Sequence, residues 1–132
     1  MEEADKKRYK KLYLKTGRVY IRDMQKNIDA LRKNHTNTNA IENLFLCAHA
    51  LRGQSLLMGY TSLGNYLESV EKVFNARKRH ILDIDAAVLN ALEAGIERVA
   101  AAFRQIEVTG SDLDFLKEIR YLQEAAGTKI YI

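Results

Sequence analysis

Apolar residues recur every three or four positions along most of the chain, which is the spacing of helices that bury one face. The pattern predicts five helices and no strand. The links are short and polar, and short links favour antiparallel neighbours. The sequence therefore predicts an all-α fold, an antiparallel up-down four-helix bundle with an additional C-terminal helix that docks outside the bundle or extends it. The expected bounds are Ala4–Lys33, Thr38 or Asn39 to about Gly59, Thr61–Arg77, Asp83 or Asp85 to about Glu107, and Asp112–Gly127.

Each predicted helix carries a stripe of apolar residues that is expected to face the core. Gly17 lies inside the first helix, where glycine weakens helix formation. The stripes, in chain order, are Tyr9, Tyr13, Thr16, Tyr20, Met24, Ile28 and Leu31; Ile41, Leu44, Ala48, Leu51 and Ser55; Leu63, Leu67, Val70 and Phe74; Val88, Leu92, Ile96, Val99, Phe103 and Ile106; and Leu113, Leu116, Ile119 and Leu122.

Polar side chains at the expected helix starts are predicted to cap the helices, because a side-chain oxygen can accept hydrogen bonds from first-turn amides. Glu42 follows Asn39 by three residues, as in a capping box. The expected caps are Thr38 or Asn39, Thr61 or Ser62, and Asp83 or Asp85.

Composition indicates one domain, spanning residues 1–132. The chain is 47% hydrophobic and 29% charged, an ordinary globular balance. No apolar run reaches the length of a membrane span, and the start lacks the apolar stretch of a secretory signal. The single cysteine, Cys47, excludes an internal disulfide and fits a reducing compartment. We therefore expect a cytoplasmic protein that does not insert into a membrane.

The formal charge of +4 owes much to one basic cluster, residues 6–11. Such a cluster can meet nucleic acid or an acidic membrane. No base-stacking pattern of aromatic residues runs through it, and the rest of the chain is nearly charge-balanced. We interpret the cluster as a solvated helix start and expect no nucleic-acid partner.

One face of the second predicted helix carries the candidate chemistry. His49, Arg52 and Gly53 are three and four residues apart and so share a face, and Leu56 extends it by one turn. This face is rotated away from the apolar stripe of the same helix. The sequence therefore predicts that the His49 imidazole points out of the bundle.

Each residue of this face has a chemical use. A neutral imidazole is a nucleophile. Arg52 places a guanidinium, which pairs well with phosphate oxygens, one turn from His49. Gly53 removes a side chain where a partner would approach. On the third predicted helix, the Glu71 carboxylate is expected to accept the proton of one imidazole nitrogen and leave the other free to attack.

At these residues the chain resembles the histidine phosphotransfer (HPt) family of two-component signalling. The family signature, His-x-x-Lys-Gly followed by a glycine and an aromatic residue, is matched by His49-Ala50-Leu51-Arg52-Gly53 and Met58-Gly59-Tyr60. The segment Leu67-Glu68-Ser69-Val70-Glu71 resembles the family's third helix. The resemblance extends from Tyr13 to about Leu122. It is strongest to the N-terminal phosphotransfer domain of chemotaxis histidine kinases.

The resemblance implies a phosphoryl carrier in a phosphorelay. A histidine kinase catalytic domain with bound ATP, in cis or in trans, would phosphorylate His49. The phosphohistidine would then pass the group to an aspartate of a response-regulator receiver domain. Arg52 corresponds to the family's lysine near the phosphate, Gly53 to its clearance glycine and Glu71 to the carboxylate that binds the imidazole.

Four positions depart from the family pattern: Arg52, Glu68, and Leu56 and Leu57, which are bulkier than the small residues common after the glycine. Arg52 replaces lysine, which keeps the charge but changes its reach and geometry. Glu68 stands where chemotaxis kinases often carry a second histidine, so the hydrogen-bond network around His49 is expected to differ.

The sequence predicts no cofactor in this chain. It has no glycine-rich phosphate loop, so ATP and Mg²⁺ are expected to belong to the partner domains. His35, His49 and His80 are too scattered to predict a metal site. Two alternatives stay open: the chain is a free-standing phosphotransfer protein or the first domain of a longer kinase, and the same bundle can serve as a helical adaptor without phosphotransfer.

Overall fold

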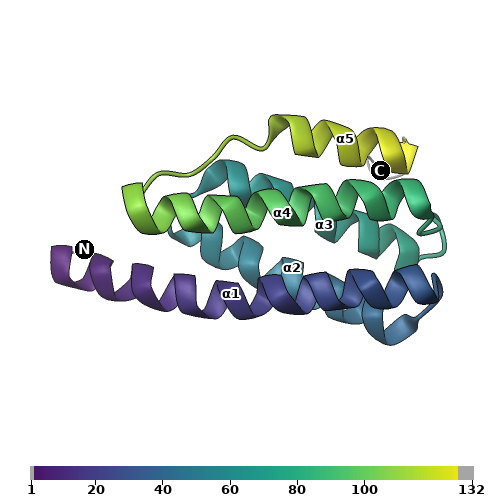
Figure 1. Ribbon diagram of the computed structural model, residues 1–132, viewed down its shortest axis with the longest axis horizontal. Coiled ribbons are helices and arrows are strands. Elements are labelled where there is room, and N and C mark those ends of the chain that lie inside the picture. The colour runs from purple at the N-terminus through teal and green to yellow at the C-terminus, as the bar shows by residue number, and fades with distance from the viewer. Residues whose placement is uncertain (1, 128–132) are drawn as a thin grey trace.

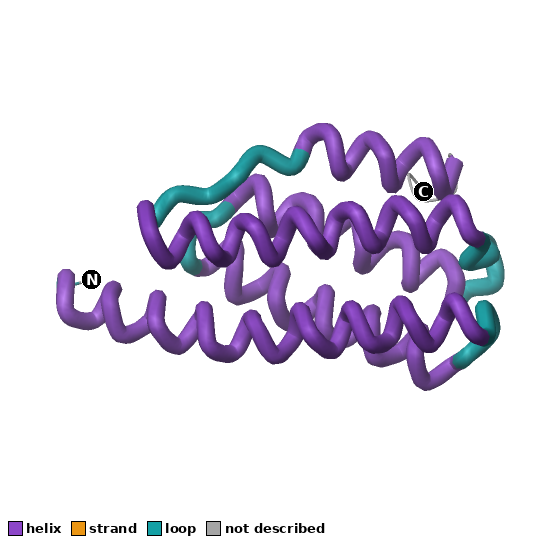
Figure 2. Tube along the Cα trace, in the orientation of Figure 1, coloured by secondary structure: helices purple, strands orange, loops and turns teal. Residues whose placement is uncertain are grey.

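The computed structural model describes residues 2–127, and this part of the chain forms five helices and no strand. The helices are α1 (Glu3–Lys33), α2 (Thr38–Leu57), α3 (Thr61–Lys78), α4 (Ala86–Thr109) and α5 (Leu116–Ala126). Helices α1 to α4 run antiparallel in chain order, and α5 packs outside the bundle against α3 and α4 (Figures 1 and 2). The predicted fold class is confirmed.

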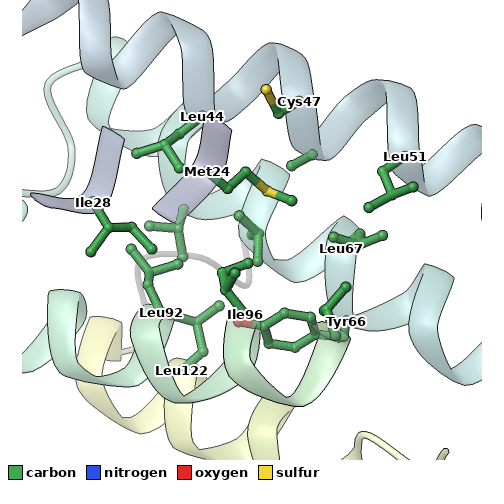
Figure 3. Packing of buried hydrophobic residues seen from close by; sticks show 14 of the residues in the cluster. Met24, Ile28, Leu44, Cys47, Leu51, Tyr66, Leu67, Leu92, Ile96 and Leu122 are labelled. Carbon is green, nitrogen blue, oxygen red and sulfur yellow. The ribbon is translucent and has the colours of Figure 1, made fainter. Parts of the chain in front are cut away.

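The core lies between the four long helices, and Figure 3 shows side chains from all of them meeting there. The predicted stripes of α2, α3 and α4 are buried. The stripe of α1 is only partly right, because Tyr9 is half-exposed and Leu14 and Ile21 are buried as well. Helix α1 packs against both α2 and α4, so it buries two neighbouring rows of residues rather than one.

Gly17 has a packing role that the sequence did not reveal. A Cβ atom at this position would lie 2.3 Å from a ring carbon of Phe103 on α4. The glycine therefore lets the aromatic ring of Phe103 contact the backbone of α1. The loss of helix propensity at Gly17 is the cost of this close approach.

The structure confirms one of the three predicted helix caps, that of α4. Asn37 caps α2, because its Oδ1 accepts a hydrogen bond from the Ala40 amide at 3.0 Å. The expected caps Thr38 and Asn39 are wrong, since both residues already lie in the first turn of the helix. Glu42 forms no capping box and pairs with Lys78 at 2.9 Å. Asp85 caps α4 through the Val88 amide, as predicted.

The start of α3 is bound by residues that lie about fifty positions away. Asp112 Oδ2 accepts a hydrogen bond from the Leu63 amide, and Ser62 Oγ accepts one from the Phe115 amide. The prediction that Thr61 or Ser62 caps α3 is therefore wrong. The predicted start of the fifth helix at Asp112 is also wrong, because residues 110–115 are not helical and two of them, Asp112 and Phe115, are hydrogen-bonded to the start of α3. Leu116 is half-exposed, and Phe115 takes its place in the core.

Candidate functional site

His49 projects from the outer face of α2. Its side chain is 57% exposed, whereas the neighbouring Ala48 and Leu51 are fully buried. The predicted outward orientation of the imidazole is confirmed. Because α2 buries the opposite face, its backbone holds the imidazole at the surface of the bundle.

Glu71 on α3 joins His49 to Arg52. Its Oε1 atom lies 3.3 Å from His49 Nδ1 and 2.8 Å from Arg52 Nε. The carboxylate is mostly buried, at 17% exposure. The antiparallel packing of α2 on α3 brings together three residues that the sequence places on two helices. Because Nδ1 faces the carboxylate, the other ring nitrogen, Nε2, is left on the outer side.

The charges of Arg52 and Glu71 offset each other at this site. Arg52 and Glu71 form an ion pair one turn along α2 from the imidazole. Among residues 2–127 the guanidinium makes no other ion pair. Its terminal nitrogens are therefore free to meet an anion on His49. The sequence predicted a cation one turn from His49, and the structure adds that the Nε atom of Arg52 is paired with Glu71.

Phe45 is a neighbour of the imidazole that sequence reasoning missed. Its ring lies one helical turn before His49, with the ring planes within 10° of parallel and the centroids 6.1 Å apart. Lys78 Nζ on α3 lies 4.3 Å from the Phe45 centroid. The four-residue spacing from Phe45 to His49 was a signal available in the sequence. The lysine was not, because only the packing of α3 brings it there.

Of the two remaining candidate residues, Gly53 lies beside His49 as predicted, whereas Glu68 does not contact the cluster within the described residues. A Cβ atom on Gly53 would have nothing within 4 Å, so the surface beside His49 is open there. Glu68 does not join the cluster among the described residues. Its carboxylate is half-exposed and lies 3.8 Å from Lys72 on its own helix.

Other candidate chemistry does not gather around His49. Within residues 2–127 no group of three His, Cys, Asp or Glu side chains is placed to hold a metal ion. His35 and His80 are exposed on separate loops. Cys47 is buried, and burial raises the pKa of its thiol to about 11. None of the helices described has the length and apolar character needed to cross a membrane.

A helical bundle with an exposed histidine paired to a carboxylate is the class of protein found here, and comparison of the chain with known families names that class. Residues 11–102 match the Hpt domain. The match covers more than half of the chain, and the chain belongs to the Hpt domain family. The resemblance seen in the His49 motif is confirmed.

Individual relatives come from chemotaxis. The chain is 22% identical over 108 residues to the chemotaxis protein CheA of Bacillus subtilis, covering 82% of this chain and 16% of that protein. It is also 22% identical over 106 residues to CheA of Halobacterium salinarum, covering 80% of this chain and 16% of that protein. The chain therefore spans about a sixth of the length of these relatives.

A solved structure shares the fold. It is the phosphorylated P1 domain of CheA3 in complex with CheY6 from R. sphaeroides, at 15% identity and a TM-score of 0.80. The superposition covers 94% of this chain and 96% of that one. Because α5 lies beyond residues 11–102 and the superposition covers nearly the whole chain, the fifth helix is part of the shared fold.

Proposed function

We propose that this protein carries phosphoryl groups in a chemotaxis-type two-component pathway, with His49 as the phosphoacceptor. The observation that carries the proposal is the contact of Glu71 with Nδ1 of an exposed imidazole, in a chain of the Hpt family. A carboxylate at this place favours the tautomer with the proton on Nδ1. The Nε2 lone pair is then available on the solvent side.

The first step moves a phosphoryl group from ATP to Nε2. The Nε2 lone pair attacks the γ-phosphorus of ATP held by a histidine kinase domain, and a nitrogen–phosphorus bond forms. The bond from that phosphorus to the bridging oxygen breaks, and ADP leaves with the electron pair. The ring gains positive charge, which the Glu71 carboxylate stabilises. The guanidinium of Arg52 offsets part of the charge of the new phosphoryl group.

The second step passes the group to a receiver domain. A carboxylate oxygen of the receiver's aspartate attacks the phosphorus, and the nitrogen–phosphorus bond breaks with its electron pair returning to Nε2. The imidazole is then regenerated. The Mg²⁺ of both steps belongs to the partner domains, since phosphoryl transfer uses the metal to neutralise charge beside the nucleotide or acceptor. Within this chain, His49, Arg52, Gly53 and Glu71 do the work of holding, orienting and exposing the group.

The proposal treats residues 1–132 as one phosphotransfer module that works in the cytoplasm with no cofactor of its own. The CheA3 domain found by structural comparison was solved in complex with CheY6, which supports a receiver-type partner for this chain. The CheA relatives support a kinase partner, either in the same chain or separate. Glu68 lies outside the contacts of His49 and has no assigned step.

The test is acid-labile phosphorylation by a histidine kinase core and ATP, compared between the wild type and two variants. His49→Gln should fold normally and take up no label, because it lacks the nucleophile. Glu71→Ala should keep the fold and take up label more slowly, by about tenfold or more, because the imidazole loses the carboxylate that orients it. Circular dichroism checks the fold of each variant.

Two outcomes would contradict the proposal. Undiminished labelling of His49→Gln would remove His49 from its role. A wild-type protein that takes up no label from any chemotaxis-type kinase core would favour the alternative, a helical adaptor that has this fold without the chemistry.

A further inference from the structure

The contact of His49 with Glu71 leaves the plane of the imidazole undetermined. Glu71 Oε1 lies 3.3 Å from Nδ1 and so restrains one atom of the ring. A ring held at one atom can still swing about that contact, and the His49 side chain is 57% exposed, so the surrounding protein does not enclose it. A second contact, on the face of the ring, is needed if Nε2 is to keep one direction.

Phe45 supplies such a contact. The centroids of its ring and of the imidazole are 6.1 Å apart, and the two planes are 10° from parallel. This separation lies within the range of about 4.5–7 Å over which offset aromatic rings attract each other. The two residues are one helical turn apart on α2, so the helix backbone keeps the rings beside each other. A parallel ring at this place limits rotation of the imidazole about its bond to Cβ.

The Phe45 ring is itself held from two sides. Its side chain is partly buried and packs against the hydrophobic core. Lys78 Nζ, from α3, lies 4.3 Å from the ring centroid, where the electron-rich face attracts a cation. The same Nζ atom lies 2.9 Å from the carboxylate of Glu42, which keeps the lysine in place. The ring beside His49 is therefore attached to both α2 and α3.

These contacts form a continuous row along the seam between α2 and α3. The members on α2 follow one another at intervals of three and four residues, and the two members on α3 are seven residues apart, so each set shares one face of its helix. Each member contacts the next one in the row. In order, the row is Glu42, Lys78, Phe45, His49, Glu71 and Arg52.

We propose that Phe45 is a positioning residue for the phosphorylation of His49, and that Lys78 keeps its ring in place. The proposal rests on the proposed function and adds the group that sets the direction of the nucleophile. Phe45 holds the plane of the imidazole, so that Nδ1 stays on Glu71 and the Nε2 lone pair stays on the solvent side. A phosphoryl group on Nε2 gives the imidazole positive charge, which the face of the Phe45 ring stabilises.

The first experiment measures the tautomer of His49 in the wild type and two variants. Phe45→Leu keeps an apolar side chain and removes the flat ring, whereas Phe45→Tyr keeps the ring. The ¹⁵N chemical shifts of the His49 ring, recorded at about pH 8, where an ordinary imidazole is neutral, report which nitrogen carries the proton. Phe45→Leu should show less of the tautomer with the proton on Nδ1, and Phe45→Tyr should match the wild type.

The second experiment measures the reaction of His49 with phosphoramidate, which avoids any docking with a kinase. Nε2 attacks the phosphorus, the phosphorus–nitrogen bond of phosphoramidate breaks, and ammonia leaves with the electron pair. Phe45→Leu should react about two- to tenfold more slowly, the range that one aromatic pair supplies, and Phe45→Tyr should react like the wild type. The exposed residues His35 and His80, followed in the same spectra, are internal references whose rates should not change.

Matched controls separate positioning from a general loss of packing or charge. Leu46→Ala shortens a half-exposed apolar side chain at the next position of α2 and should change neither the tautomer nor the rate. Lys78→Met removes the charge over the Phe45 ring and should shift both readouts in the direction of Phe45→Leu, but by less. Lys72→Met, at an exposed lysine of the same helix, should shift neither. Thermal unfolding confirms that each variant is folded.

The outcomes distinguish this proposal from the proposed function. An unchanged tautomer and an unchanged phosphoramidate rate in Phe45→Leu would overturn the positioning role and leave His49 standing as the phosphoacceptor. A Phe45→Tyr variant that behaves like Phe45→Leu would also overturn it, because the aromatic ring would then not be the cause. A wild-type protein that takes up no label from a kinase would overturn the proposed function, while the tautomer comparison would still decide whether Phe45 orients the imidazole.

Discussion

A substitution at Gly53 should affect the stability of α2 and the proposed phosphotransfer in opposite directions. It lies inside an exposed stretch of helix, and a Cβ atom there would meet nothing within 4 Å. Gly53→Ala should therefore stabilise the protein by about 0.5–1 kcal/mol, because alanine is the better helix former and the site has space for it. Urea unfolding measures this gain.

The same substitution should slow phosphoryl transfer to a receiver severalfold, since the added methyl group stands where the partner approaches His49. Loss of stability in Gly53→Ala would show that the glycine is needed by the fold. Unchanged transfer, with the stability gain, would show that the opening beside His49 is not used.

At the scale of single residues, the sequence specified most of the candidate site. Spacing on one helix was enough to place His49, Arg52 and Gly53 on the same face. Glu71 was predicted as the partner of the imidazole although it lies on another helix, and the family resemblance pointed to the same residue. Their roles in phosphotransfer stay predictions. Lys78 was beyond sequence reasoning, since nothing in its local pattern shows that it lies over Phe45.

At the scale of elements, the contact of α3 with α4 depends on an unusually close fit. The Tyr66 ring is fully buried, and a Cβ atom on Gly95 of α4 would lie 1.6 Å from its hydroxyl oxygen. The hydroxyl has no hydrogen-bond partner among residues 2–127. The glycine thus gives the tyrosine its room, and the hydroxyl adds a buried polar atom without a compensating bond.

Substitutions at this contact should have opposite effects. Gly95→Ala should destabilise the protein by about 3 kcal/mol or more, because the ring cannot move out of a packed core. Tyr66→Phe should leave stability equal or raise it by about 1 kcal/mol, because it removes an unpaired buried hydroxyl. Denaturant unfolding with a common m-value measures both. A large loss of stability in Tyr66→Phe would show that the hydroxyl has a partner, such as a buried water.

The helix ends show why element boundaries are hard to predict. The start of α4 was predictable because Asp85 caps it within three residues. The start of α3 was not, because its amide partner, Asp112, arrives from the loop before α5. That interaction also explains why α5 begins later than expected. Residues 112–115 are hydrogen-bonded to the start of α3 and are therefore not part of the helix.

At the scale of the whole molecule, buried acids should make stability fall in alkaline solution. Burial raises the pKa of Tyr13, of Tyr66 and of the Cys47 thiol, the last to about 11. The folded protein therefore keeps protons that the unfolded chain releases near pH 9 for the thiol and pH 10 for the phenols. In this pH range the unfolded chain binds fewer protons than the folded protein. The free energy of unfolding therefore decreases as pH rises above about 9.

Urea unfolding between pH 7 and 11 checks this dependence, with the decline expected to begin near pH 9. Cys47→Ser is unsuitable as a control because it changes the core, so Tyr66→Phe serves: it should make the decline shallower. A free energy of unfolding that stays constant to pH 11 would contradict the burial of these groups.

The sequence by itself determined the fold class, the number of helices and the outward face of α2, because these follow from the periodicity of apolar residues in a single helix. It also determined the family, through the residues around His49. Tertiary structure alone decided what else reaches those residues: the ion pair of Glu71 with Arg52, and Lys78 over Phe45. Such contacts depend on how the helices pack and on their register, and a local pattern of residues contains neither.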